Sequence, residues 1–189
     1  MGRIKYIDIA KGILIMLVVV GHTDFGEFGN FFAHTLILWF HMPAFFLISG
    51  VLFKMPISNP VKNKTTFVKA VKHYIVPYFS WCLILWIIFR QESLVKNFIR
   101  VCYGGCLNTN MYSFPFWFIN SLCIGFLFLS VVIYYKNKSR SFQITTCLCL
   151  FSLAHLLKSN IVDLPWGIGQ SLVAIPFMFL GYWGGEIIY

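Results

Sequence analysis

The sequence predicts an all-α membrane protein, a bundle of about six transmembrane helices with its N-terminus in the cytoplasm. Composition is the first observation behind this prediction: of 189 residues, 59% are hydrophobic and only 11% are charged, and the mean hydropathy is +0.77. A water-soluble domain is less apolar than this. The second observation is the recurrence of long apolar stretches, and the third is the uneven distribution of basic residues between the loops that join them.

The apolar stretches approach the roughly 20 residues that are needed to cross a bilayer. We expect spans at about 7–26, 31–53, 74–90, 115–135, 142–157 and 171–188. No segment between them is long enough to form a separate soluble domain. All six spans therefore belong to a single membrane domain over residues 1–189.

The charged residues predict how these spans are oriented. One side of the membrane holds ten basic residues: Arg3, Lys5, Lys54, Lys62, Lys64, Lys69, Lys72, Lys136, Lys138 and Arg140. The other side mixes both signs: Arg90, Lys96, Arg100, Lys158, Asp24, Glu27, Glu92 and Asp163. Because Lys and Arg accumulate in cytoplasmic loops, the N-terminus is predicted inside. The net charge of +9 is then a topology signal, and the expected partner is the lipid bilayer and not nucleic acid.

The first span carries an unusual polar stripe. At 3.6 residues per turn, one helix face collects Asp8, Lys11, Ile15, Val18 and His22. Ionisable groups are costly inside a membrane and indicate a functional site. Lys11 and His22 are roughly 16 Å apart along the helix axis. We therefore expect them to line two levels of one cavity, with Lys11 near the cytoplasmic edge and His22 in the outer part of the membrane.

The second span contributes two further histidines. His34 and His41 are seven residues apart and share a helix face, so both are candidates to line the cavity that His22 enters. Pro43 is expected to kink the helix and to free a backbone carbonyl. Ser49 and Gly50 are small enough for close helix packing.

The later spans carry fewer chemical groups. The segment from Gln91 to Phe114 begins with an apolar and basic pattern that predicts an amphipathic helix lying in the membrane interface, formed by Leu94, Val95, Lys96, Phe98, Ile99, Arg100 and Val101. In the fourth span we single out Trp117 and Asn120 as candidate substrate-binding residues. Aromatic clusters near span ends serve either as interface anchors or as substrate platforms.

Several of these residues together resemble the acyltransferase-3 family of integral membrane O-acyltransferases, and most closely its fucose 4-O-acetylase-like members, which modify bacterial surface polysaccharides. The resemblance rests first on a basic residue that is followed, after ten intervening positions, by histidine: Lys11 and His22, preceded by Asp8. It rests also on four later motifs: Phe40-His41-Met42-Pro43, Ser49-Gly50, Pro115-Phe116-Trp117-Phe118, and Pro176-Phe177 with Gly181-Tyr182. It covers essentially all 189 residues but only the N-terminal part of the family domain. The chain is therefore expected to be an incomplete domain.

The resemblance implies a bacterial, multi-pass inner-membrane enzyme of the cell envelope. Such an enzyme takes an acetyl group from cytoplasmic acetyl-coenzyme A and transfers it to a carbohydrate hydroxyl at the outer face. The essential histidine of the family maps onto His22, and its basic partner maps onto Lys11. No metal is expected, since His34 and His41 lack the spacing of metal ligands.

The chemistry of acyl transfer agrees with these assignments. Histidine titrates near neutral pH, so His22 can accept the proton of the attacking hydroxyl as a general base; the alternative is a neutral histidine that only hydrogen-bonds a neighbouring helix. Lys11 either binds the phosphates of coenzyme A or pairs with Asp8, which also orients it. His41 either shapes the cavity and stabilises the oxyanion, with Ser49 and Asn120 as remoter donors, or satisfies a carbonyl freed by the helix kink.

Two other functions fit parts of the sequence. Asp8, Lys11 and His22 on one face also suit a proton relay in a transporter, although no internal repeat with matching broken helices is evident. The third interpretation is an inactive fragment of the acyltransferase that folds with a missing second half.

Overall fold

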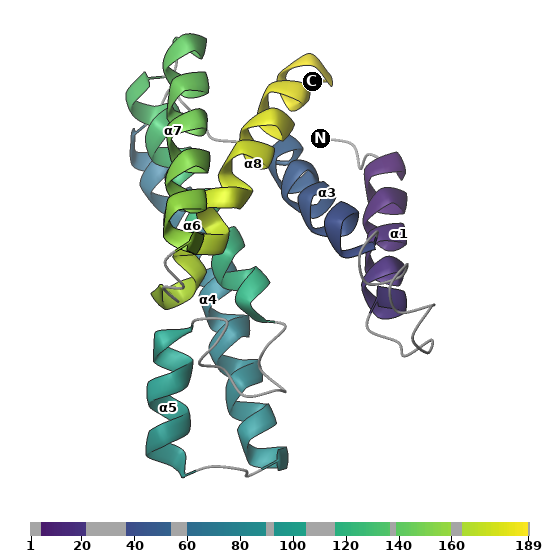
Figure 1. Cartoon of the computed structure of the whole chain (residues 1–189), viewed down its shortest axis with the longest axis vertical. Helices are drawn as coiled ribbons and strands as arrows, with labels where there is room; N and C mark the ends of the chain where they lie inside the picture. Colours follow the sequence, from purple (N-terminus) through teal and green to yellow (C-terminus); the bar gives the residue numbers. More distant parts are fainter. Residues whose placement is uncertain are drawn as a thin grey trace. The chain divides into compact units, whose positions relative to one another are not determined.

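The computed structural model describes residues 5–21, 37–53, 60–89, 93–104, 116–136, 139–159 and 164–188. Within these ranges the chain is entirely helical and has no strand, which confirms the predicted all-α class (Figure 1). The helices in chain order are α1 (Lys5–Gly21), α3 (Leu38–Val51), α4 (Pro60–Phe89), α5 (Leu94–Tyr103), α6 (Trp117–Lys136), α7 (Arg140–Ser159), the 3-10 turn η3 (Pro165–Gly167) and α8 (Ile168–Ile188).

The chain forms two compact units, which we describe separately. Unit 1 joins residues 1–53 to residues 177–189, and unit 2 comprises residues 54–176. The division falls inside α8, directly after Pro176, so one helix contributes its first half to unit 2 and its second half to unit 1. Proline removes a backbone hydrogen-bond donor from a helix interior, which makes this position a natural boundary.

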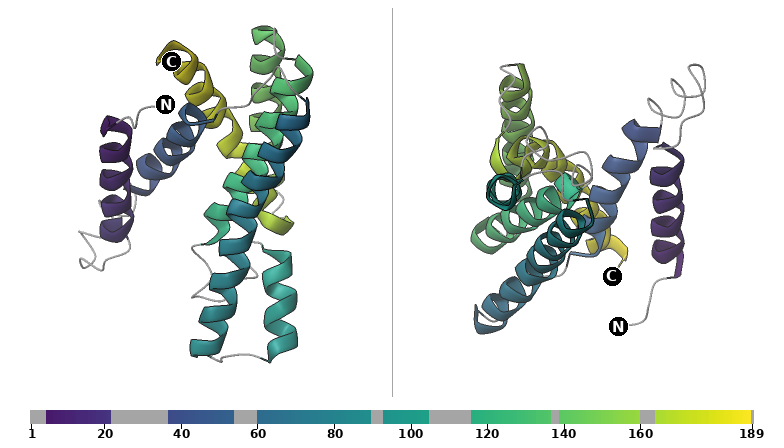
Figure 2. Two further views of the ribbon diagram at one scale, coloured as in Figure 1. Left: turned by 180° about the vertical axis from the view of Figure 1, so that it is seen from behind. Right: turned by 90° about the horizontal axis from the view of Figure 1, so that it is seen from below.

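In unit 1, α1 packs beside α3 (Figure 2). The buried face of α1 is formed by Ile7, Leu14 and Gly21, which are seven residues apart and so recur on one side of the helix. This buried face is not the face that carries the predicted polar stripe of Asp8, Lys11 and His22, but lies beside it on the helix. Lys11 lies next to the buried face and is half-buried, whereas Ile15 is 56% exposed. Ile15 of the predicted stripe therefore does not pack inside unit 1, because the small and apolar residues of α1 form its packed side.

Glycines bring α3 and the second half of α8 into backbone contact within unit 1. A methyl group placed on Gly50 would collide with the carbonyl oxygen of Met178, and one on Gly181 with the carbonyl oxygen of Leu47. One helical turn further along α8, a methyl group on Gly185 would lie 2.8 Å from the carbonyl oxygen of Val51. This is the small-residue packing used between membrane helices, and it confirms the packing role expected of Gly50.

In unit 2, α4 is the longest helix and begins at Pro60, well before the apolar stretch expected to start near residue 74. It packs mainly against α6. The ring centroids of Tyr74 and Phe126 are 6.2 Å apart at this contact. A core of Tyr78, Cys82 and Val101, flanked by Phe79, Phe116 and Ile119, joins α4, α5 and the start of α6.

Among the residues that the structure describes, two helices contain stretches that are long and apolar enough to cross a membrane, Lys72–Phe89 of α4 and Arg140–Leu157 of α7. Shorter apolar helical stretches are Trp39–Val51 and Trp117–Ile133. The expected third to sixth spans coincide with helices, and so do parts of the first and second. Since only two of these helices contain such a stretch within the described residues, the bundle of six spans stays a prediction.

Candidate functional site

The predicted site begins on α1, where Asp8 and Lys11 are one helical turn apart and both half-buried. His22 directly follows Gly21, the last described residue of α1, and itself lies outside the described residues, as does His34. A methyl group added at Gly21 would lie 3.2 Å from Cγ2 of Ile37. The residue before His22 thus lies against the segment that leads into α3.

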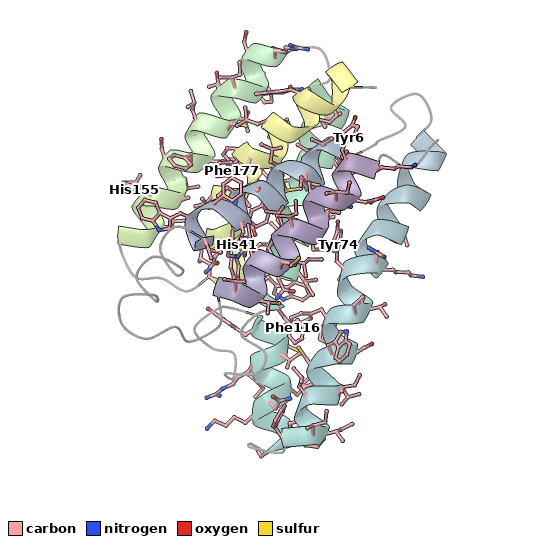
Figure 3. The ribbon with its side chains drawn as sticks, turned by 90° about the vertical axis from the view of Figure 1, so that its right-hand side faces the viewer. Tyr6, His41, Tyr74, Phe116, His155 and Phe177 are labelled. Atoms are coloured by element: carbon pink, nitrogen blue, oxygen red, sulfur yellow. The ribbon has the colours of Figure 1, made fainter. Side chains whose placement is uncertain are left out.

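His41 is anchored close to that contact. Its Nδ1 donates a hydrogen bond to the carbonyl oxygen of Ile37, and its ring is only 1% exposed (Figure 3). In the neutral ring this bond assigns the proton to Nδ1 and leaves Nε2 as the nitrogen that can accept a proton. The end of α1 and the imidazole of His41 therefore share Ile37 as a common neighbour within unit 1.

Ser49 and Trp117 have more local surroundings. The hydroxyl of Ser49 donates to the carbonyl oxygen of Phe45, 2.8 Å away and one turn earlier in the same helix, so its proton is already used inside α3. Trp117 is half-buried at the start of α6, where its ring meets that of Phe118 edge-on at 6.3 Å. Ser49 belongs to unit 1 with Asp8 and Lys11, whereas Trp117 belongs to unit 2.

Asn120 is part of a buried polar cluster in unit 2. Its side-chain amide is 1% exposed and donates to the carbonyl oxygen of Gly104 at 3.1 Å. Tyr78 donates to the carbonyl of Val101 at 2.8 Å, and the indole of Trp166 donates to the carbonyl of Cys102 at 2.8 Å. The geometry gives Asn120 a role in holding the end of α5, and a substrate contact of this residue stays a prediction.

Sequence analysis singled out neither Trp166 nor Tyr78 of this cluster, and Trp166 has the more unusual backbone. It has a left-handed backbone, with φ 59°, which is uncommon for a bulky residue and indicates that its surroundings hold it in place. Its ring packs against Tyr78 and Phe79 at centroid distances of 5.9 and 6.2 Å. The Pro165-Trp166-Gly167 sequence indicates a turn, but it gives no sign of this long-range hydrogen bond.

The hydroxyls of Ser121 and Ser171 both hydrogen-bond to Gly167, the residue that follows Trp166. Each donates to the carbonyl oxygen of Gly167, at 3.4 and 2.7 Å respectively. Gly167 has φ 65°, and a methyl group there would lie 3.1 Å from the Ser121 hydroxyl. The Ser121 bond therefore joins the start of α8 to α6, and the Ser171 bond lies within the first turn of α8 itself.

Replacing Asn120 by alanine is expected to lower the free energy of unfolding by about 1–3 kcal/mol, because the buried carbonyl of Gly104 loses its donor. Thermal unfolding of the purified protein in detergent measures this. Ser130→Ala on the same helix is the matched control, since the hydroxyl of Ser130 bonds only the Phe126 carbonyl of its own helix. Equal melting temperatures for the two variants would contradict the anchoring role of Asn120.

Comparison with known proteins gives the family. A family model described as an acyltransferase domain matches residues 4–188. Nodulation protein NolL of Mesorhizobium japonicum (strain LMG 29417 / CECT 9101 / MAFF 303099) is 30% identical over 146 residues, which cover 70% of this chain and 36% of that protein. The chain thus spans little more than a third of this relative, and no solved structure matches it. Since the family model covers nearly the whole sequence, the chain belongs to the acyltransferase-3 family.

Proposed function

We propose that this domain transfers an acetyl group from cytoplasmic acetyl-coenzyme A to a hydroxyl of a cell-surface carbohydrate, within the inner membrane of a bacterium. The observation that carries the proposal is the acyltransferase match over residues 4–188, which includes both Lys11 and His22. The six predicted spans with a cytoplasmic N-terminus supply the topology. The two apolar windows in α4 and α7 support membrane insertion.

In the proposed reaction, His22 acts as the general base. It removes the proton of the sugar hydroxyl while the hydroxyl oxygen attacks the thioester carbonyl carbon. The tetrahedral intermediate collapses, the carbon–sulfur bond breaks, and the imidazolium returns the proton to the departing thiolate. The products are an acetyl ester and free coenzyme A. His41 lies near the end of α1, since Gly21 and the ring of His41 both meet Ile37. With its Nδ1 proton donated to the Ile37 carbonyl, the neutral ring has no N–H left for an oxyanion, which supports the cavity-shaping role of His41.

Lys11 has a separate task on the donor side. Lys11 is half-buried at the border of the packed face of α1, and Asp8 is one turn away and able to orient it. A partly desolvated ammonium attracts phosphate more strongly than one in bulk water. The pantetheine arm of coenzyme A would span the roughly 16 Å between Lys11 and His22 and carry the acetyl group outward.

A vesicle assay tests this function directly. Membranes of cells expressing the natural gene are prepared inside-out and right-side-out, and both receive acetyl-coenzyme A labelled in its acetyl group. Inside-out vesicles are expected to form a labelled, base-labile ester on carbohydrate, whereas sealed right-side-out vesicles stay unlabelled. A transporter would accumulate solute without forming this ester. Absence of the ester from inside-out vesicles that contain the acceptor would overturn the proposal.

Lys11→Ala is expected to raise the KM for acetyl-coenzyme A about tenfold or more, because a charge-assisted contact to phosphate contributes about 1.5–3 kcal/mol. Initial rates at several donor concentrations give this constant. Lys5→Ala is the control, since Lys5 is exposed on the same helix. A KM that stays unchanged in Lys11→Ala would limit the side chain to pairing with Asp8.

A further inference from the structure

One side of α5 is apolar and uncovered in unit 2. Its four exposed large side chains, at 58–67% exposure, are Leu94, Val95, Phe98 and Ile99. Lys96 and Arg100 lie on the opposite side of the helix, where Lys96 is exposed and Arg100 is half-buried. This is the pattern of a helix that meets a bilayer.

The arrangement of α5 differs from that of a helix lying flat on a membrane. Only residues 90–93 separate α5 from the end of α4, and the Tyr78 hydroxyl bonds the carbonyl of Val101 at 2.8 Å. These two points make α5 run antiparallel to the second half of α4, as Figures 1 and 2 show. Tyr78 is 11 residues, or about 16 Å, before Phe89. The last turn of α5 therefore lies beside the interior of the apolar window Lys72–Phe89.

The apolar side of α5 continues onto α4. The second half of α4 exposes seven large apolar side chains: Val76, Trp81, Leu83, Ile84, Ile87, Ile88 and Phe89. The two helices thus form one hairpin with lipid-compatible surface on both arms. Burying such a surface in hydrocarbon is favourable at about 25 cal/mol per Å².

The C-terminal end of α5 provides an independent observation. In water, the last carbonyls of a helix are satisfied by solvent, but inside a membrane they need protein donors. Here two of them and the carbonyl of the C-cap residue accept hydrogen bonds from three different elements: Val101 from Tyr78 of α4, Cys102 from Trp166 of η3, and the C-cap Gly104 from Asn120 of α6. The carbonyl of Arg100 accepts from the backbone N–H of Gly104, which has φ 63°. The C-terminal end of α5 therefore has the hydrogen-bond donors that a helix end needs when it is buried in a bilayer.

We infer that α5 is a re-entrant membrane helix: it enters the lipid at its N-terminal end and ends within the bilayer, with its apolar side against the acyl chains. Lys96, which is exposed in the first turn of α5, then extends its ammonium group back to the lipid headgroups. This inference rests on the membrane placement in the proposed function. It replaces the interfacial position expected for α5 from its sequence alone, since a flat helix would not run along α4.

Fluorine NMR of the protein in phosphatidylglycerol-containing nanodiscs tests this inference. Trifluoromethyl-phenylalanine is introduced by codon suppression at one position at a time. Its fluorine relaxation is measured once with dissolved oxygen, which enters lipid, and once with a nickel chelate, which stays in water. The ratio of the two relaxation enhancements, oxygen to nickel, reports how deeply the position lies in lipid. Phe98 is expected to show an oxygen-to-nickel ratio comparable to that of Leu83 on the exposed side of α4 and several-fold above that of Lys96. Ile99 is expected to show a higher ratio than Val95, because it lies about 6 Å deeper.

The control position separates the possible failures. A low ratio at Leu83 would overturn the membrane placement itself. A high ratio at Leu83 with strong nickel access at Phe98 would place α5 in water, and weak access of both reagents at Phe98 would show that protein covers it; either result overturns the inference while the proposed function stands. Equal ratios at Val95 and Ile99 would show a flat interfacial helix, which also contradicts it.

Discussion

His22→Ala is expected to lower the rate of ester formation by about 10²–10⁴-fold, the usual contribution of a positioned general base. Alanine cannot accept the hydroxyl proton, and the thioester carbonyl is then attacked only by the less nucleophilic neutral alcohol. The measurement is the initial rate of labelled ester formation in inside-out vesicles. The KM for acetyl-coenzyme A is expected to stay close to that of the unaltered protein, because the proposed function places the donor phosphates at the Lys11 end of α1.

His155→Ala is the matched control for this loss. His155 projects from the exposed side of α7, and its removal is expected to leave the rate unchanged (Figure 3). Both variants are compared at equal amounts of membrane-inserted protein, which separates catalysis from folding. Full activity in His22→Ala would remove the general-base role, and an equal loss in His155→Ala would attribute the effect to structure.

Gly181→Ala is expected to destabilise the protein strongly. Its methyl group would meet the carbonyl oxygen of Leu47, a backbone atom that cannot rotate away, so α3 and α8 would have to separate. Overpacking of this kind costs about 3 kcal/mol or somewhat more. The melting temperature in detergent is then expected to fall by about 6–12 °C.

Gly184→Ala tests whether the contact, and not the loss of glycine, is responsible. Gly184 lies on the same helix three residues later, and an added methyl group there meets nothing within 4 Å. Because alanine favours helix over glycine, Gly184→Ala is expected to be neutral or slightly stabilising. A similar loss in both variants would contradict the close crossing of α3 and α8.

The helical class follows from local signals. Apolar stretches of suitable length predict helices because backbone hydrogen bonds in an apolar environment are satisfied within each helix. The same local pattern predicts α5 correctly, since its apolar and basic residues alternate with helical spacing. The start of α4 at Pro60 was not evident from hydropathy, because the basic residues before residue 74 interrupt the apolar pattern but do not prevent a helix.

The candidate site was likewise predicted from the sequence in part only. Lys11 and Asp8 are placed on α1 by sequence spacing, and the resemblance to the acyltransferase family connects them with His22. The orientation of the helix was less predictable: Ile15 falls on the exposed side, because the contact with α3 selects Ile7, Leu14 and Gly21. The sequence suggests that Asn120 binds substrate, but in the structure its amide donates a hydrogen bond to the carbonyl of Gly104, 16 residues earlier in the chain.

The sequence by itself determined that this is an apolar helical chain of the acyltransferase-3 family, because composition, helix length and the Lys11–His22 spacing are properties of residues close together in the chain. Only the tertiary structure decided which glycines permit backbone contact and which side chains satisfy the end of α5. Gly181 meets Leu47, and Trp166 meets Cys102, across separations for which no local pattern exists. Such contacts depend on how whole helices pack, and packing is set by the shape of all the side chains at once.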